Sequence, residues 1–175
     1  SDLLKIKSDM ISSDGRFLME KRCLHDSHSI EVYLERLDRM MNVGNEKLGG
    51  RVTNNRTNAM VVRFPGWGNR IYRHVESPNK DCRHVTCIYC PNKDWHNSNH
   101  GGVLRIEPTL ALTSKAADVE LKFDRLVCFW SDRRNIHAVL NTYMDLFAIT
   151  TWHYYGTEWR EALGSRESQH ANTLG

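Results

Sequence analysis

The sequence predicts a mostly β domain, a sandwich or barrel, with one helix packed beside it. One stretch near the N-terminus has helical periodicity, whereas the chain from Ala59 onward divides into short apolar segments separated by turn signals. Many short strands at such spacing are typical of sandwiches and barrels. The length of 175 residues suits a single domain.

Composition indicates an ordinary soluble protein, with 40% hydrophobic and 26% charged residues. The 24 basic and 21 acidic residues are interspersed, so no run of like charge predicts nucleic-acid or membrane binding. An odd number of cysteines, five, and the lack of a signal-peptide pattern near Ser1 predict reduced thiols in the cytoplasm or nucleus. We expect a monomer.

The first predicted element is a helix over residues 29–42. Ile30, Leu34, Leu37 and Met41 recur at helical spacing and form one apolar stripe. We expect an irregular segment over residues 1–26, a domain over 27–163 and a loose polar tail over 164–175.

Seven strands are predicted after the helix. They cover residues 59–64, 71–75, 83–90, 103–106, 125–130, 136–140 and 146–152. Alternation in 83–90 separates Val85, Cys87 and Tyr89 from Thr86, Ile88 and Cys90. In the last strand it directs Leu146, Ala148, Thr150 and Trp152 to one face.

The sharpest local motif is His74-Val75-Glu76. In a strand, residues two apart project to the same side, so an imidazole and a carboxylate would emerge together. A distant histidine, His137, would complete two histidines and one carboxylate, the ligand set of non-haem Fe(II) oxygenases.

Two other metal sites are conceivable from spacing. Cys82, Cys87 and Cys90 have the spacing of a plant-type iron–sulfur motif, but alternation separates Cys87 from Cys90. Cys87, Cys90, His96 and His100 loosely match a zinc module with too short a central spacing. Other histidines, His153 among them, are expected on the surface.

Residues 47–153 resemble the egl nine family of hypoxia-inducible factor prolyl hydroxylases. The stretches that match are Lys47-Leu-Gly49, Asn55-Arg-Thr57, Ala59-Met60, Pro65-Gly66, Arg73-His-Val75, Val85-Thr-Cys-Ile-Tyr89, Asn92-Lys-Asp-Trp95, Gly101-Gly102, Leu104-Arg-Ile106, Lys122-Phe-Asp-Arg-Leu126, Phe129-Trp-Ser-Asp-Arg-Arg-Asn135, Ala148-Ile-Thr150 and Trp152. So many matches in one order are far more specific than the histidine and carboxylate motif alone.

The resemblance implies a double-stranded β-helix, or jelly roll, that holds Fe(II) at one mouth and uses 2-oxoglutarate as cosubstrate, with ascorbate in support. It implies a proline-containing peptide of a hypoxia-inducible transcription factor as substrate. By the same resemblance, the metal ligands are His74, Glu76 and His137; the 2-oxoglutarate pocket is lined by Ile88, Leu104, Thr150 and Trp152; and the substrate meets Arg83 and Trp152.

The chain departs from the family at several of these positions. Glu76 stands where the family has aspartate, and Leu146 stands where it has the arginine that binds the far carboxylate of 2-oxoglutarate. Phe64 and Cys90 replace two tyrosines of that pocket. Strand alternation directs the neighbouring Arg63 away from it.

Two functions therefore follow from the sequence. The first is a peptidyl-proline 4-hydroxylase in oxygen sensing that uses Fe(II), 2-oxoglutarate and O2. The alternative is a degenerate homologue that keeps the fold and binds a peptide or protein partner without turnover, which the replacements at Leu146, Phe64 and Cys90 motivate.

Overall fold

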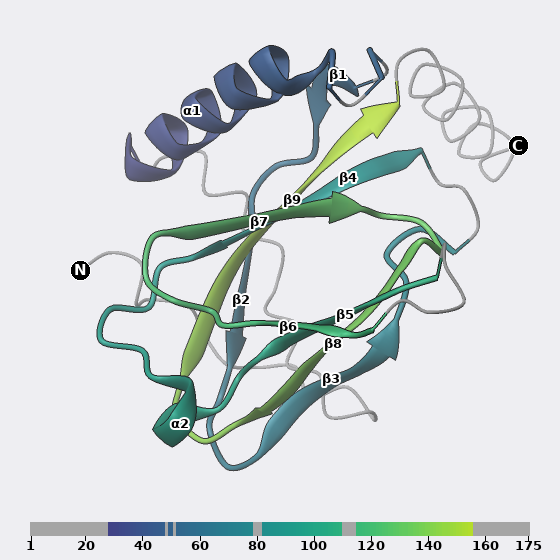
Figure 1. The fold of residues 1–175 in the computed structure, drawn as a ribbon. Coiled ribbons are helices and arrows are strands. Elements are labelled where there is room, and N and C mark those ends of the chain that lie inside the picture. Colours follow the sequence, from purple (N-terminus) through teal and green to yellow (C-terminus); the bar gives the residue numbers. More distant parts are fainter. Residues whose placement is uncertain (1–27, 48, 51, 79–81, 110–114, 156–175) are drawn as a thin grey trace, which may run out of the picture.

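The structure, a computed structural model, describes residues 28–155, apart from residues 48, 51, 79–81 and 110–114. The predictions for the segment 1–26, the domain end at residue 163 and the tail 164–175 lie outside the described residues. Within them, two antiparallel sheets face each other, and a helix lies against the outer side of the larger sheet (Figure 1).

The helix α1 spans His28–Gly44, close to the predicted 29–42. The apolar stripe is its buried side, where Ile30, Leu37 and Met41 are almost fully covered. Leu37 and Met41 pack on Val85 and Cys87 of the larger sheet. The helix therefore forms because its stripe covers a sheet face, as amphipathic helices do.

The larger sheet has the order β1-β9-β4-β7, and β2 also pairs with β9. Its strands are β1 (Val52–Arg56), β2 (Met60–Phe64), β4 (Arg83–Cys90), β7 (Arg125–Trp130) and β9 (Leu146–Tyr155). The smaller sheet has the order β3-β8-β5-β6, with β3 (Asn69–His74), β5 (Leu104–Pro108), β6 (Ala117–Val119) and β8 (Asn135–Thr142). A short helix, α2 (Asn97–His100), precedes β5.

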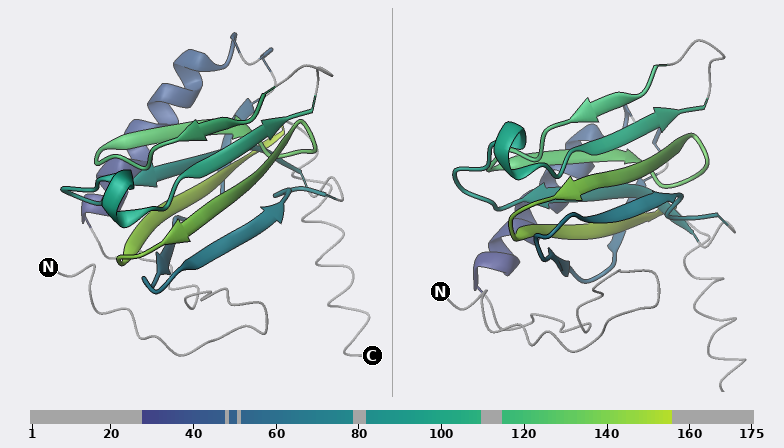
Figure 2. Two further views of the ribbon diagram at one scale, coloured as in Figure 1. Left: turned by 60° about the horizontal axis from the view of Figure 1, so that its bottom comes forward. Right: turned by 90° about the horizontal axis from the view of Figure 1, so that it is seen from below.

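The main core lies between the two sheets, which Figure 2 shows stacked. Ile88 and Cys90 of β4 face this core, where they join Leu104 of the smaller sheet. Val85 and Cys87 face the other way, beneath α1. The alternation predicted for residues 83–90 is confirmed, and it makes β4 a strand with two buried faces.

Two strands, β1 and β6, were not predicted from the sequence. The strand β1 reads Val-Thr-Asn-Asn-Arg and carries no apolar alternation, while β6 is short and partly exposed at a sheet edge. The prediction that His153 lies on the surface is wrong, because its side chain is fully buried. The reason is topological: β9 lies inside the sheet, between β1 and β4. Neither described helix is long and apolar enough to cross a membrane.

The packing of α1 on the sheet leads to a stability prediction. Leu37→Ala removes a side chain that is 2% exposed, so the free energy of unfolding should fall by about 2–5 kcal/mol. The matched control is Val43→Ala on the same helix, where the side chain is 85% exposed and the change should stay within about 0.5 kcal/mol. Urea unfolding followed by circular dichroism measures both; equal effects would contradict the packing.

Candidate metal centre

Two histidines face each other across neighbouring strands of the smaller sheet. His74 ends β3, and its cross-strand partner in the antiparallel ladder is His137 of β8. Their ring centroids lie 4.3 Å apart. Directly opposed residues of an antiparallel pair project to the same side, so the two imidazoles emerge together from one sheet face.

Glu76 joins them by a different route from the one predicted. The motif predicts His74 and Glu76 on one strand, but β3 ends at His74 and Glu76 lies in the bend that follows. The bend is held because the Ser77 N–H donates to the Ser131 carbonyl at 2.9 Å. Ser131 is fully buried, and its hydroxyl bonds that of Thr86 on β4 at 2.7 Å. Contacts to the larger sheet, not strand alternation, thus position this carboxylate.

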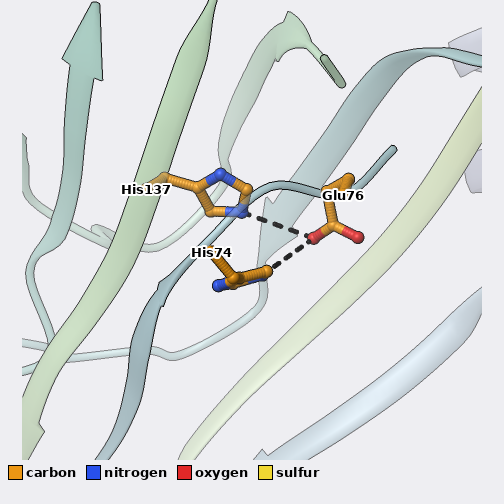
Figure 3. A group of neighbouring side chains, drawn as sticks. All are labelled: His74, Glu76 and His137. Carbon is orange, nitrogen blue, oxygen red and sulfur yellow. Dashed lines mark hydrogen bonds and ion pairs between the residues drawn. The ribbon is translucent and has the colours of Figure 1, made fainter. Parts of the chain in front are cut away.

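The three side chains converge on one point, as Figure 3 shows. The Nε2 atoms of His74 and His137 lie 3.4 Å and 3.3 Å from the same oxygen, Glu76 Oε1. One ligand atom from each residue can be chosen so that all three lie within 4.8 Å of one another. Elsewhere in the described chain, neither the cysteine set nor the cysteine–histidine set gathers in this way.

Backbone hydrogen bonds orient both imidazoles. His74 Nδ1 lies 2.8 Å from the Tyr72 carbonyl, and His137 Nδ1 lies 3.2 Å from the Asn135 carbonyl. A carbonyl only accepts, so each Nδ1 carries a proton and each ring directs its Nε2 at Glu76. There each Nε2 can share a proton with the carboxylate or, without that proton, offer a lone pair to a metal ion.

The carboxylate is charged and partly shielded. Burial raises the pKa of Glu76, but the hydrogen bonds and charges of His137 and His74 outweigh it and hold the pKa at about 2. The side chains of Glu76 and His137 are 15% and 3% exposed. On the solvent side, Arg83 Nη1 lies 3.4 Å from Glu76 Oε2, leaving Oε1 to the histidines.

The donor set fits a divalent transition metal. Two imidazole nitrogens and one carboxylate oxygen form the facial arrangement that holds Fe(II) in non-haem oxygenases. A backbone carbonyl bonded to Nδ1, as at both histidines, is a usual way in which proteins fix the tautomer of a metal-binding histidine. The edge of Phe129 packs on the His137 ring, with centroids 4.7 Å apart, which keeps that ring in place.

A cavity of about 400 Å³ opens beside the three residues, between the two sheets. Its walls include most of the predicted pocket residues: Phe64, Arg83, Ile88, Leu104, Thr150 and Trp152. Sequence reasoning missed Met60, Val62, Leu121 and Val139, which also line it. The apolar alternation of β2 and β8 was the signal for Met60, Val62 and Val139, whereas Leu121 lies between β6 and β7, outside any strand.

Leu146 and Cys90 occupy the core at one end of the cavity. Both side chains are fully buried in the same cluster as Phe64 and Leu104. The predicted inward face of β9 is confirmed, because Ala148, Thr150 and Trp152 line the cavity and Leu146 continues the row into the core. Arg63 touches the cavity wall, but its guanidinium binds Asp145 at 2.6 Å, toward the solvent.

Residues 59–154 match the family model of the 2OG-Fe(II) oxygenase superfamily. This segment covers more than half of the chain and includes all three converging residues.

Curated relatives point to one group within that superfamily. Human Egl nine homolog 1 is 46% identical over 130 residues, which are 74% of this chain and 30% of the human protein. Mouse prolyl hydroxylase EGLN3 is 45% identical over 134 residues, which are 77% of this chain and 55% of the mouse protein. The chain thus spans about a third to a half of the length of these relatives.

A solved structure agrees with the sequence relatives. The prolyl hydroxylase of Trichoplax adhaerens, in complex with a peptide fragment of the hypoxia inducible factor oxygen degradation domain, superposes with a TM-score of 0.67. It is 36% identical, and the match covers 74% of this chain and 59% of that one. A Pseudomonas putida prolyl-4-hydroxylase, 23% identical with a TM-score of 0.64, shares the fold; the match covers 75% of this chain and 67% of that one.

The convergence predicts a metal-binding experiment. His137→Ala should weaken Mn(II) binding by more than about a hundredfold, because it removes a proposed ligand. Changing a residue that only orients a ligand already lowers metal affinity by about 10–100-fold. His96→Ala, an exposed histidine, is the matched control and should not alter binding. Calorimetric titration under anaerobic conditions measures both affinities. If His137→Ala bound Mn(II) as tightly as the parent protein, the metal would have to bind at another site.

Proposed function

Because the chain belongs to the 2OG-Fe(II) oxygenase superfamily and to its egl nine group, we propose that it is an iron-dependent prolyl hydroxylase. The observation that carries the proposal is the convergence of His74, Glu76 and His137 at the mouth of a cavity between two sheets. The jelly-roll fold and the egl nine relatives support the reaction class.

His74, Glu76 and His137 would hold Fe(II) through three ligand atoms. Three protein ligands leave coordination positions open for O2 and for a 2-oxo acid, and the bound iron supplies the oxidising chemistry. The protein holds the ligands in place and keeps water from the site. The side chain of His137 is 3% exposed and lies under Phe129, so it meets both demands.

The substrate is proposed to be a prolyl residue of a hypoxia-inducible factor type peptide. The bound peptide of the Trichoplax relative supports this choice. On this chain, Arg83 and Trp152 stand at the cavity wall next to Glu76, with the guanidinium of Arg83 5.2 Å from the centre of the Trp152 ring. An aromatic face beside a cation is a suitable seat for a proline ring and the peptide carbonyls around it.

The remaining properties follow from the family and stay proposals. We place the active unit at residues 27–163, acting as a monomer in the cytoplasm or nucleus, with ascorbate keeping the iron reduced. The 2-oxo acid is 2-oxoglutarate in the superfamily to which the chain belongs.

The decisive test is oxygen transfer to a peptide. Protein supplied with Fe(II), O2, ascorbate and a mixture of 2-oxo acids should add one oxygen atom to the proline of a hypoxia-inducible factor peptide, as mass spectrometry would record. His137→Ala should abolish the transfer, because the metal loses a ligand. Peptide binding without any oxygen gain in the parent protein would instead support the degenerate homologue.

A further inference from the structure

The cavity has one polar end and one apolar end. At the polar end lie the three converging residues together with Arg83 and Trp152. Along β9 the inward row then runs from Trp152 through Thr150 and Ala148 to Leu146, away from that end. Residues two apart in a strand advance by about 6.6 Å, so Leu146 ends the row roughly 20 Å from Trp152.

The smaller sheet shows the same gradient. Ile106 is the cross-strand partner of His137, and Leu104 is the partner of Val139, one strand step farther from the metal ligands. Leu104 is fully buried and Val139 is 6% exposed. The apolar residues of both sheets thus lie away from the candidate ligands, and the polar groups that β3 adds at that end are Asn69, which donates to the Gly66 carbonyl at 2.7 Å, and Arg70.

The described cations of the cavity wall all have partners. The positively charged residues on the cavity wall are Arg63, Arg70 and Arg83. Arg63 binds Asp145, with the two side chains 35% and 45% exposed. Arg70 stacks on the exposed Tyr72 ring at 4.5 Å, and Arg83 binds Glu76. Each of these three guanidinium groups is thus engaged, Arg83 at the polar end and Arg63 and Arg70 with exposed partners at the rim of the other end.

The chemistry of a 2-oxo acid divides in the same way. Its carboxylate and keto oxygens chelate a metal, and the rest of the molecule must occupy the space beyond. For 2-oxoglutarate that remainder ends in a second carboxylate, which is costly to bury unless a cation or several donors meet it. Ile88, Leu104 and Ala148 offer neither. Thr150 offers one hydroxyl, and the Asn69 amide already donates to the Gly66 carbonyl.

We propose that this site binds a 2-oxo acid with an apolar side chain, of the 4-methyl-2-oxopentanoate or phenylpyruvate type, in preference to 2-oxoglutarate. Leu146, Phe64 and Cys90 are the residues that determine the preference, because they make the far end an extension of the hydrophobic core. The inference rests on the proposed function for the metal at His74, Glu76 and His137, and it changes which cosubstrate that metal receives.

The test is binding, not turnover. Anaerobic Mn(II)-loaded protein is titrated with 2-oxoglutarate, 4-methyl-2-oxopentanoate, phenylpyruvate and pyruvate. The apolar acids should bind at least about a hundredfold more tightly than 2-oxoglutarate, because burying an unpaired carboxylate lowers the affinity by at least that factor. Tighter binding of 2-oxoglutarate would overturn the proposal. Failure to bind Mn(II) at all would instead refute the proposed function beneath it.

Two variants assign the preference to Leu146. Leu146→Ala opens space at the far end, so the longer 2-oxooctanoate should gain affinity relative to the parent. Leu146→Arg supplies a cation, so 2-oxoglutarate should gain about a hundredfold. Thermal unfolding of both variants shows whether they fold, and the titrations of the parent protein test the preference without them. An unchanged acid preference in folded variants would remove Leu146 from the argument.

Arg63 supplies a sharp control. If 2-oxoglutarate binds the parent tightly and Arg63→Met removes that binding, the guanidinium has left Asp145 to meet the far carboxylate, and the apolar preference is wrong. Arg105→Met is the matched control, because Arg105 pairs with Asp118 and is not part of the cavity wall. It should leave every affinity unchanged.

A second site lies on the opposite face of the same strands. Cys87 of β4 and Cys128 of β7 are direct cross-strand partners, with their sulfur atoms 3.4 Å apart. Cys87 is fully buried under α1, whereas Cys128 is exposed among the described residues. The hydrogen bond between the two sulfur atoms lowers the pKa of Cys128, and because Cys128 is exposed, it is the sulfur that a small disulfide can reach.

We infer that Cys87 and Cys128 form a dithiol that closes to an intrachain disulfide by exchange with a small-molecule disulfide. The Cys128 thiolate attacks that disulfide and one small thiol leaves. Cys87 then gives up its proton, attacks the Cys128 sulfur and expels the second small thiol. The two protein thiols are oxidised and one disulfide is reduced. The sulfur atoms must close to about 2.05 Å, a movement that direct cross-strand neighbours allow.

Mass spectrometry of glutathione-disulfide-treated protein tests the dithiol, in a Cys23→Ser background. The expected product has lost two hydrogen atoms and contains a peptide that links Cys87 to Cys128. In Cys87→Ser the reaction should end with a glutathione adduct on Cys128. The control Cys82→Ser should still form the disulfide between Cys87 and Cys128. Free, alkylatable thiols at both positions in the treated parent would overturn the inference.

Discussion

The convergence of two imidazoles and one carboxylate on one point is the constraint on which the candidate site depends. With Nδ1 of His74 and His137 bound to backbone carbonyls, both Nε2 atoms are directed at the Glu76 carboxylate, where a shared proton or a metal ion can hold the three groups together. The fold provides what this convergence needs. The β3–β8 ladder sets the two imidazoles face to face, and the buried Ser131 ties the Glu76 bend to the larger sheet.

The same two sheets explain the two ends of the cavity. Side chains near the sheet ends reach water, so charged groups such as Arg83 and Glu76 persist there. Leu146 begins β9 yet is fully buried, so a charge placed there would need a partner. The proposed site would thus separate metal chelation from recognition of the rest of the 2-oxo acid. Changes at Leu146 or Phe64 would then affect the second function and leave the first intact.

Local patterns predicted much of the molecule. The spacing of Ile30, Leu37 and Met41 predicted the helix within two residues at either end, and alternation predicted both faces of β4 and the inward row of β9. The same reasoning failed where burial depends on distant strands. The polar β1 pairs with β9 although its sequence carries no alternation, and His153 is buried because its strand became an interior one.

The sequence by itself determined which residues can bind a metal and, through its resemblance to a known family, which family the chain belongs to. Residue types and the order of motifs are enough for both conclusions, because neither depends on how distant segments pack. Only the tertiary structure decided how the three side chains meet, because Glu76 lies beyond the end of β3 and its direction comes from Ser77 and Ser131, not from strand periodicity. It also decided that the three arginines of the cavity wall are engaged at its rim or polar end, since the partners of a charge are set by contacts between residues far apart in the chain.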